Sequence, residues 1–336
     1  MHALALALPP TLRLGASSWA YPGWQGLVWE GAHSEQLLSK EGLSALAQHP
    51  LMRTVGVDRG FYRPLTVSQY ERYASQVPED FRFVVKAPSV VTDAWVRGDD
   101  GRGQQANPAF LDPGLAARTF VEPALAGLGH KVGVLVFQLS PLRLVHPEQL
   151  TRVLGQLRTL LSALPPLQTV APGAVIAVEV RDPEWLAPDV LPRFAQVLRD
   201  TGATTCLSLH PKMPPLSEQL HLLRLLWPGP LVARWNLHPV HGAYGYADAE
   251  RLYAPYQRMH DPDPHTHALL ARTIAGVTGR GQPAYVTISN HAEGCAPRTL
   301  HTLAEHVVAA CAAASPPQTD TALRPHGAAG RRTDYS

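Results

Sequence analysis

The chain has 336 residues, of which 45% are hydrophobic and 17% are charged, and its formal net charge is +2. This length fits one α/β barrel with extensions, because such barrels run to about 250 residues or more as a single domain. A net charge this small does not by itself imply a nucleic-acid-binding coat or binding to an anionic membrane surface. Any anion binding therefore has to come from a local cluster of charges.

The cysteines and the N-terminal residues indicate the cellular compartment in which the protein is expected. The only cysteines are Cys206, Cys295 and Cys311, an odd number without metal-type spacing, which argues against a disulfide framework and a zinc site. We expect a cytoplasmic protein. Residues 1–10 have an apolar run without a basic segment or a clear cleavage site, so we expect a flexible start rather than a signal peptide. No apolar stretch approaches the ~18 residues of a membrane helix, so no membrane partner is expected.

Eight segments are predicted as strands, because side chains alternate between two faces or a short apolar run turns polar at its end. In chain order they are Leu12 to Trp19, Arg53 to Asp58, Phe81 to Pro88, Val132 to Gln138, Ile176 to Trp185, Thr204 to His210, Leu231 to His238 and Gln282 to Asn290.

Helices are predicted between these strands from apolar periodicity and end signals. They are Gln36 to His49, Thr66 to Tyr73, Phe120 to Leu128, Pro147 to Leu164, Leu191 to Thr201, Ala247 to Met259, His265 to Thr278 and a last helix through about Ala313. Thr66 is the predicted N-cap of its helix, and Gly202 the predicted stop. Trp95 to Pro113 lacks periodicity, and we interpret it as a long loop, either an insertion or a lid, with the insertion favoured.

Strands that alternate with helices, each polar at its C-terminal end, predict a TIM (β/α)8 barrel over residues 11–314, with the site at the C-terminal face. A doubly wound open sheet is the alternative. Against it, no strand is followed by a glycine-rich phosphate fingerprint in a strand-turn-helix context. Residues 315–336 are polar and proline-rich, which predicts a disordered tail.

Several motifs, taken together, resemble the YecE-like family of TIM-barrel proteins, domain of unknown function 72 (DUF72). They are Gly15-Ala16-Ser17-Ser18-Trp19 with Tyr21 and Trp24, Phe61-Tyr62-Arg63, Phe81 to Pro88, Phe137-Gln138-Leu139, Glu179 to Trp185, and Asn290 to Gly294 before Ala296-Pro297. The resemblance implies the barrel and carries no settled activity.

The chain departs from the family pattern at the second strand. The family usually reads Val-Glu-Ile-Asn there, and this chain has Val55-Gly56-Val57-Asp58. The carboxylate has in effect moved by two positions, so Asp58 is the candidate to take over any role of the family glutamate. At the eighth strand, Ser289 precedes Asn290 where the family often has two asparagines.

Polar side chains at the strand ends are expected to converge on one pocket. They are Asp58, Lys86, Gln138, Glu179, Arg181, His210, Arg234, Asn236 and His238, with His291 nearby. Cations and carboxylates packed into one barrel mouth would shift one another's pKa values and hold an anionic substrate. The structural alternative is that Glu179 pairs with Lys86 or Arg181 only to satisfy buried charge.

The first hypothesis is a phosphoester-directed hydrolase for a phosphorylated or otherwise anionic small molecule, with a nucleic-acid phosphodiester as a weakly supported alternative. Lys86, Arg181 and Arg234 would hold the oxyanion, with Glu179 as general base and His210 or His238 as general acid. Asp58 completes the catalytic candidates. The other binding candidates are Gln138, Tyr62, Asn236, Asn290 and His291.

The second hypothesis is a non-catalytic binder of a sugar or nucleotide. Its stacking surface would be Trp19, Tyr21, Trp24 and Trp185, because exposed aromatic rings stack on sugars and bases. The alternative for the Trp19 to Trp24 loop is a lid of bulky side chains over the core.

No cofactor is predicted. Glu179, His210, His238 and Asp58 are the residue types that bind a divalent metal, but Lys86 and the arginines would repel a cation.

Overall fold

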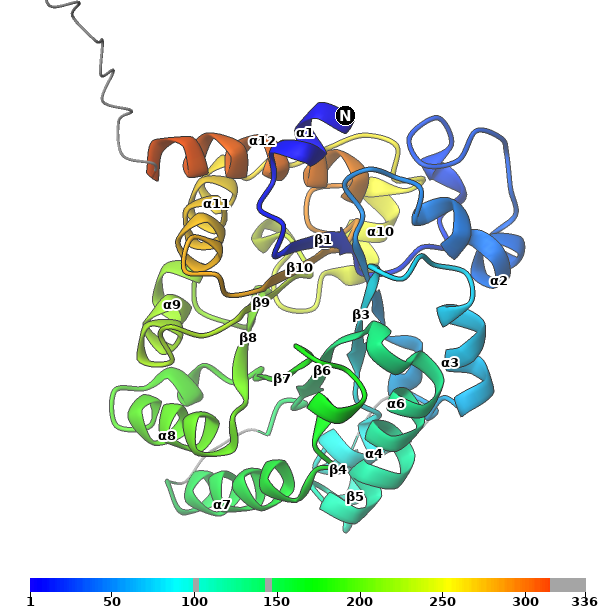
Figure 1. Ribbon diagram of the computed structural model, residues 1–336. Coiled ribbons are helices and arrows are strands. Elements are labelled where there is room, and N and C mark those ends of the chain that lie inside the picture. The colour runs from blue at the N-terminus through cyan, green and yellow to red at the C-terminus, as the bar shows by residue number, and fades with distance from the viewer. Residues whose placement is uncertain (99–102, 143–146, 315–336) are drawn as a thin grey trace, which may run out of the picture.

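The computed structural model describes residues 1–98, 103–142 and 147–314. Its centre is a closed barrel of parallel strands in the order β1, β10, β9, β8, β7, β6, β3, β2 (Figure 1). The strands are β1 (Leu12–Ala16), β2 (Thr54–Val57), β3 (Arg82–Lys86), β6 (Val132–Gln138), β7 (Val175–Glu179), β8 (Thr204–Leu209), β9 (Leu231–Trp235) and β10 (Ala284–Ile288). The predicted TIM barrel is confirmed, and the open sheet is excluded.

Helices surround the barrel (Figure 1). The longer ones are α2 (Glu35–Leu46), α3 (Val67–Ala74), α6 (Glu122–Leu128), α7 (Pro147–Ala163), α8 (Leu191–Thr201), α9 (Leu216–Leu225), α10 (Tyr246–Tyr253), α11 (Pro264–Thr278) and α12 (Ala296–Ala314). Short helices are α1 (His2–Ala7), α4 (Ser89–Thr92) and α5 (Pro113–Ala116). None of the helices in the described ranges combines the length and hydropathy needed to cross a membrane.

Alternation along the strands divides the core into two parts. Outward side chains pack with the helices in a large buried cluster that includes Leu14, Val55, Phe83, Leu135 and Val178. The inward apolar side chains form a second cluster, which contains Val84, Val134, Val136, Val175, Ala177, Cys206, Val232 and Tyr285. This second cluster fills the interior of the barrel beneath the polar side chains of the C-terminal face.

Local end signals were predicted correctly in two helices. Thr66 and Gln69 form a capping box at the start of α3, in which each side chain accepts a backbone N–H from the other residue. Gly202 ends α8 in the left-handed conformation, with φ of 69°.

Three elements differ from the sequence expectation. The segment predicted as a structureless loop contains an antiparallel pair, β4 (Trp95–Arg97) and β5 (Gly103–Ala106), whose exposed residues lack an apolar alternation. Helix α9 was not predicted. The helix predicted to run to Met259 ends at Tyr253, because Pro255 has no N–H for a helical hydrogen bond and constrains the residue before it.

The N-terminal residues, predicted as a flexible start, form α1 beside α12 (Figure 1). Leu4, Ala5 and Leu8 pack against the hydrophobic core. The prediction of a disordered tail concerns residues 315–336, which lie outside the described residues.

Two inward glycines let the first two strands approach each other closely. A Cβ atom at Gly15 would lie 1.8 Å from the carbonyl oxygen of Thr54, and one at Gly56 would lie 2.7 Å from that of Ser17. Both contacts are with backbone, which cannot rotate away. The position of the family glutamate, Gly56, therefore has no room for a side chain in this barrel.

We predict that Gly15→Ala destabilises the protein by about 1–3 kcal/mol, because β1 and β2 must separate to admit the methyl group. The matched control is Gly155→Ala on the exposed face of α7, where nothing lies within 4 Å of the added Cβ. That change should stabilise by about 0.5–1 kcal/mol through helix propensity. Urea unfolding of the two variants measures both values, and a Gly15→Ala variant as stable as the parent would contradict the close-approach argument.

Candidate functional site

A cavity of about 530 Å³ opens at the C-terminal ends of the barrel strands. It is lined by Ser17, Asp58, Tyr62, Lys86, Gln138, Pro141, Arg181, His210, Lys212, Arg234, Asn236, Tyr246 and Ser289. Most of the residues predicted to converge on the barrel mouth are among them. Glu179 does not line the cavity, and its carboxylate contacts the two arginines that do.

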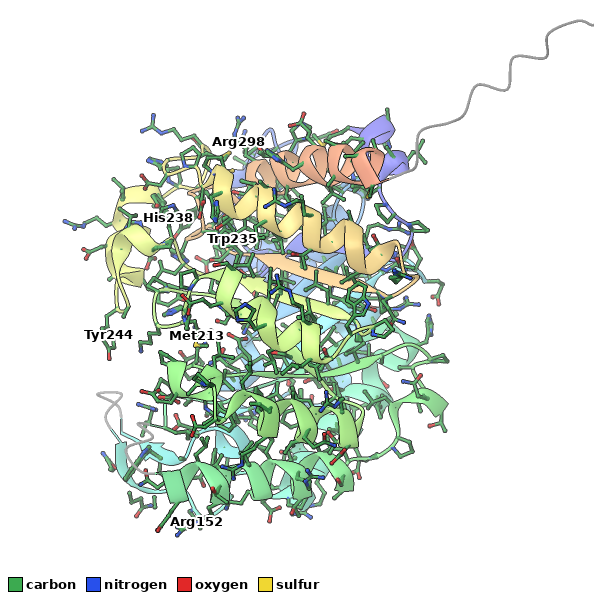
Figure 2. All side chains as sticks on the ribbon, turned by 90° about the vertical axis from the view of Figure 1, so that its left-hand side faces the viewer. Arg152, Met213, Trp235, His238, Tyr244 and Arg298 are labelled. Atoms are coloured by element: carbon green, nitrogen blue, oxygen red, sulfur yellow. The ribbon has the colours of Figure 1, made fainter. Side chains whose placement is uncertain are left out.

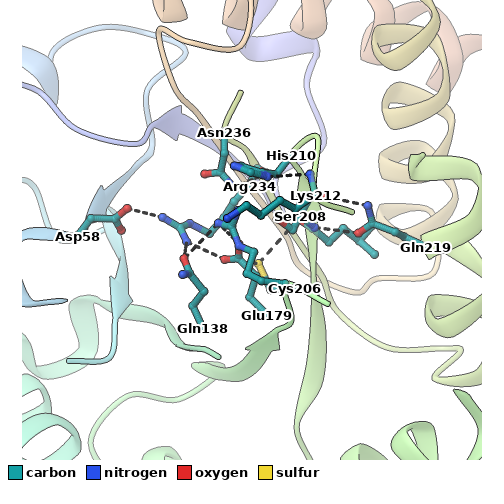
Figure 3. A network of polar contacts seen from close by, with 12 residues as sticks. Asp58, Gln138, Glu179, Cys206, Ser208, His210, Lys212, Gln219, Arg234 and Asn236 are labelled. Atoms are coloured by element: carbon teal, nitrogen blue, oxygen red, sulfur yellow. Dashed lines mark hydrogen bonds and ion pairs between the residues drawn. The ribbon is translucent and has the colours of Figure 1, made fainter. Parts of the chain in front are cut away.

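Arg234 is the hub of the polar network at the end of β9 (Figure 3). Its Nη1 donates to Glu179 Oε2 at 2.6 Å and to Gln138 Oε1 at 3.1 Å, and its Nη2 donates to Asp58 Oδ2. Burial opposes the charge on Arg234, but the carboxylates of Asp58 and Glu179 outweigh burial and raise its pKa. The guanidinium thus links strands β2, β6, β7 and β9.

Glu179 is a fully buried carboxylate at the end of β7. Arg181 Nη2 lies 2.6 Å from its Oε1 and also donates to Gln138 Oε1 at 3.2 Å. Burial alone would raise the pKa of Glu179, but Arg181 and Arg234 overcome burial and lower that pKa to about 2. Below it, Cys206 Sγ donates to Oε2 at 3.8 Å, and burial together with Glu179 raises the pKa of this thiol.

Lys86 ends β3 with a half-buried side chain that faces the cavity. Its Nζ lies 3.7 Å from the centroid of the Phe61 ring, a cation–π contact. Within residues 1–98, 103–142 and 147–314, this ammonium makes no ion pair with a carboxylate. Burial lowers the pKa of Lys86 to about 8, although the negative charge of Asp58 acts in the opposite direction.

The site carries more positive than negative charge. Its four cations are Lys86, Arg181, Lys212 and Arg234, and its two carboxylates are Asp58 and Glu179. Both carboxylates already contact a guanidinium. The remaining positive charge faces the cavity and would attract an anion.

His210 and Asn236 follow β8 and β9 and line the cavity, as predicted. His210 Nδ1 accepts a hydrogen bond from the Lys212 amide at 3.0 Å, and its ring packs on Tyr246. Burial, with help from the charges of Arg181 and Lys212, lowers the pKa of His210 to about 3. The imidazole is therefore neutral at physiological pH and has no proton of its own to give as a cationic acid.

His238 and His291 lie outside the cavity. His238 Nδ1 accepts from the amide of Val240 at 3.1 Å, which fixes the ring in the loop after β9. His291 lies between Ser289 Oγ, 3.1 Å from its Nδ1, and Tyr256 Oη, 3.2 Å from its Nε2. Strand alternation does not extend beyond the ends of β9 and β10, so the structure does not bring these two predicted site residues into the cavity.

Asn290 was also predicted as a binding residue, and the structure gives it a structural role. Its Oδ1 accepts from Trp24 Nε1 at 3.1 Å and from the Ala296 amide at 2.9 Å. It ties the first loop to the start of α12, away from the cavity.

The predicted stacking surface is corrected by the structure. The exposed fractions of Trp19, Trp24 and Trp185 are 2%, 0% and 0%, and Tyr21 is half-buried against Trp24. The three tryptophan rings therefore cannot meet a ligand from solution. They come from loops whose bulky side chains fold down onto the helices, which is the lid alternative for the first loop.

Exposed aromatic residues do occur near the cavity. The predicted Tyr62 is 88% exposed and lines the cavity, and Tyr244 is 85% exposed. Tyr244 projects from the protein surface (Figure 2), and Lys212 Nζ lies 4.1 Å from its ring centroid.

Five cavity residues were not among the predicted site residues. They are Ser17, Pro141, Lys212, Tyr246 and Ser289. Ser17 and Ser289 lie two positions after the inward Gly15 and Thr287, so strand alternation was the available signal. Tyr246 reaches the cavity from α10, and no local pattern indicates that.

The donors considered for a divalent metal do not form a ligand set. Asp58 and Glu179 both contact Arg234, and His238 does not line the cavity. In the part of the chain that the structure describes, no three His, Cys, Asp or Glu side chains are placed to hold a metal ion together. This geometry does not fit a metal bound by those four residues.

The fold and the sequence were compared with known proteins. The family described as "Protein of unknown function DUF72" matches residues 13–322. A DUF72 family protein from Enterococcus faecalis V583 is 17% identical with a TM-score of 0.59, over 88% of this chain and 95% of that chain. A DUF72 family protein from Thermotoga maritima MSB8 is 16% identical with a TM-score of 0.56, over 89% of this chain and 99% of that chain. No curated protein matches.

At these identities the two structures show similarity of fold alone. The family match, in contrast, spans most of the chain and includes every strand of the barrel. It agrees with the motifs that resembled this family, so the chain belongs to the DUF72 family.

Proposed function

We propose that the protein binds a small anionic ligand, most directly a phosphorylated one, in the cavity at the C-terminal face of the barrel. The observation that carries the proposal is the Lys86 ammonium, which faces the cavity without a carboxylate partner in the described chain. A half-buried, unpaired charge is costly, and a bound anion would offset that cost. Ser17, Asn236 and Ser289 line the same cavity and supply neutral hydrogen-bonding groups.

Glu179 supports this function by holding the arginines in place. Its pKa of about 2 makes it a weak base, and its two oxygens face Arg181 and Arg234. The general-base role considered for it would require a carboxylate with a pKa closer to neutrality and an oxygen open to substrate. We therefore assign Glu179 to positioning, and we propose ligand binding rather than phosphoester hydrolysis through this residue.

Binding of inorganic phosphate tests the proposal by isothermal titration calorimetry. We expect Lys86→Met to weaken phosphate binding about tenfold or more, because a hydrogen bond to a charged group contributes about 1.5–3 kcal/mol. The control is Lys40→Met, on the exposed side of α2, which should leave the affinity unchanged. Failure of the parent protein to bind phosphate or a phosphorylated sugar would contradict the proposal, as would equal affinities of the parent and Lys86→Met.

The affinity for sulfate should fall as the pH rises through about 8, because Lys86 is charged below its pKa and neutral above it. Sulfate keeps its own charge over this range, and guanidinium groups do not titrate there. His210, with a pKa of about 3, stays neutral, and burial raises the pKa of Tyr246. Calorimetric titrations on both sides of pH 8 measure the change, and Lys86→Met should abolish it.

The positioning role of Glu179 predicts a large effect on stability. Glu179→Gln removes the buried carboxylate and leaves two guanidinium groups facing each other, so the free energy of unfolding should fall by about 3–5 kcal/mol. The control is Glu184→Gln at an exposed position of the short 3-10 helix Pro183–Leu186, where an effect within about 0.5 kcal/mol is expected. Denaturant unfolding gives both values. Equal stability of Glu179→Gln and the parent would refute the role.

A further inference from the structure

Lysine is rare in this chain, and each lysine has a distinct environment. The four lysines are Lys40, Lys86, Lys131 and Lys212. Lys40 is exposed on α2. Lys131 Nζ donates to the carbonyl oxygens of Ala74 and Val77 at 3.0 and 2.8 Å, and it also pairs with Glu79. Its amino group is held in these contacts and is therefore not available as a nucleophile.

Lys86 differs from the other lysines because its ammonium group is partly removed from solvent and makes no ion pair with a carboxylate in the described chain. Its ammonium contacts the flat face of Phe61 and opens on the cavity, with the charges of Arg181 and Arg234 close enough to disfavour a further positive charge. Lys212 also lines the cavity, with its Nζ over the ring of the exposed Tyr244. An amine that is desolvated and placed beside other cations is the arrangement that favours a neutral, nucleophilic lysine.

We propose that Lys86 forms a Schiff base with the carbonyl carbon of a phosphorylated aldehyde or ketone bound in this cavity. The inference rests on the anion site proposed above. Arg181, Lys212 and Arg234 line the same cavity and would hold the phosphate group, while the carbonyl group of the ligand meets the Lys86 amine. It adds a covalent step to binding, and it narrows the ligand to a carbonyl compound.

The step balances without an oxidant, a reductant or a metal. The neutral Nζ attacks the carbonyl carbon, the new C–N bond replaces the C–O π bond, and the oxygen takes the proton that Nζ loses. The resulting carbinolamine then loses its hydroxyl group as water with one added proton, which leaves a protonated imine. Overall, one ammonium and one carbonyl give one iminium ion and one water. Asp58 and Tyr246 line the same cavity, and we assign these proton transfers to them.

The environment of Lys86 makes the attacking form available near neutral pH. With its pKa lowered to about 8 from the ordinary value of 10.5, the neutral amine is more abundant at pH 7 by a factor on the order of a hundred. The iminium ion keeps the positive charge next to Asp58, so the charge pattern of the site is the same before and after the step.

The experiment is trapping by reduction. The full-length protein is incubated with glyceraldehyde 3-phosphate and sodium cyanoborohydride, digested, and analysed by mass spectrometry for adducts at each of the four lysines. We expect Lys86 to be modified faster than Lys40, and inorganic phosphate to slow the modification of Lys86 while leaving that of Lys40 unchanged. Unphosphorylated glyceraldehyde should modify Lys86 about tenfold more slowly, because it lacks the charged group that the cations hold.

Lys86→Arg is the matched variant, since it keeps the positive charge and has no amine for an imine. It should bind phosphate and form no adduct at this position, with thermal unfolding as the check on its fold. Because the modified lysine is identified directly in the parent protein, the result does not depend on the folding of this variant.

Two negative results have different meanings. If the parent binds phosphate calorimetrically while Lys86 is modified no faster than Lys40, the Schiff base is overturned and the anion site stands. If the parent neither binds phosphate nor forms the Lys86 adduct, both proposals fail. Modification of Lys86 that is equally fast with and without the phosphate group also overturns the inference, because it would show that the anion site does not deliver the carbonyl.

Discussion

The organisation of the barrel mouth depends on one buried carboxylate. Glu179 is fully removed from solvent at the end of β7, and a charge in that position requires partners of opposite sign. Arg181 supplies one from the following loop, and Arg234 supplies another from β9. Gln138 accepts from both guanidinium groups. The ends of three strands are thereby held at fixed distances from one another, which gives the cavity a rigid floor.

The same ion pairs explain why Lys86 has no carboxylate partner in the described chain. Arg234 also contacts Asp58, so both carboxylates at the site are paired with guanidinium groups, whose several N–H donors let one side chain reach two partners. The ammonium packs on Phe61 instead and remains directed toward the cavity. The arginines are thus engaged in charge pairing within the site, whereas Lys86 is a cavity cation that makes no ion pair with a carboxylate in the described chain.

Strand alternation was sufficient to predict the barrel and most of the residues at its mouth. It placed Lys86, Glu179 and Arg234 on inward faces, because their neighbours two positions earlier are apolar and point the same way. It could not predict which carboxylate would pair with which cation, since that depends on distances across the barrel. It did not apply beyond the strand ends, where His238 and His291 belong to loops and do not line the cavity.

Aromatic residues were misjudged for a related reason: a loop sequence does not reveal whether a ring faces solvent or folds onto the core.

The close approach of β1 and β2 at Gly15 and Gly56 has a wider consequence. Because the backbone of Ser17 occupies the space beside Gly56, a relative with glutamate at this position must hold its first two strands further apart at that level. A single substitution at this position would then change the spacing of two strands and, because the barrel is closed, its shape. Homologues with glutamate here should therefore differ from this protein in the cross-section of the barrel as well as in the position of the carboxylate.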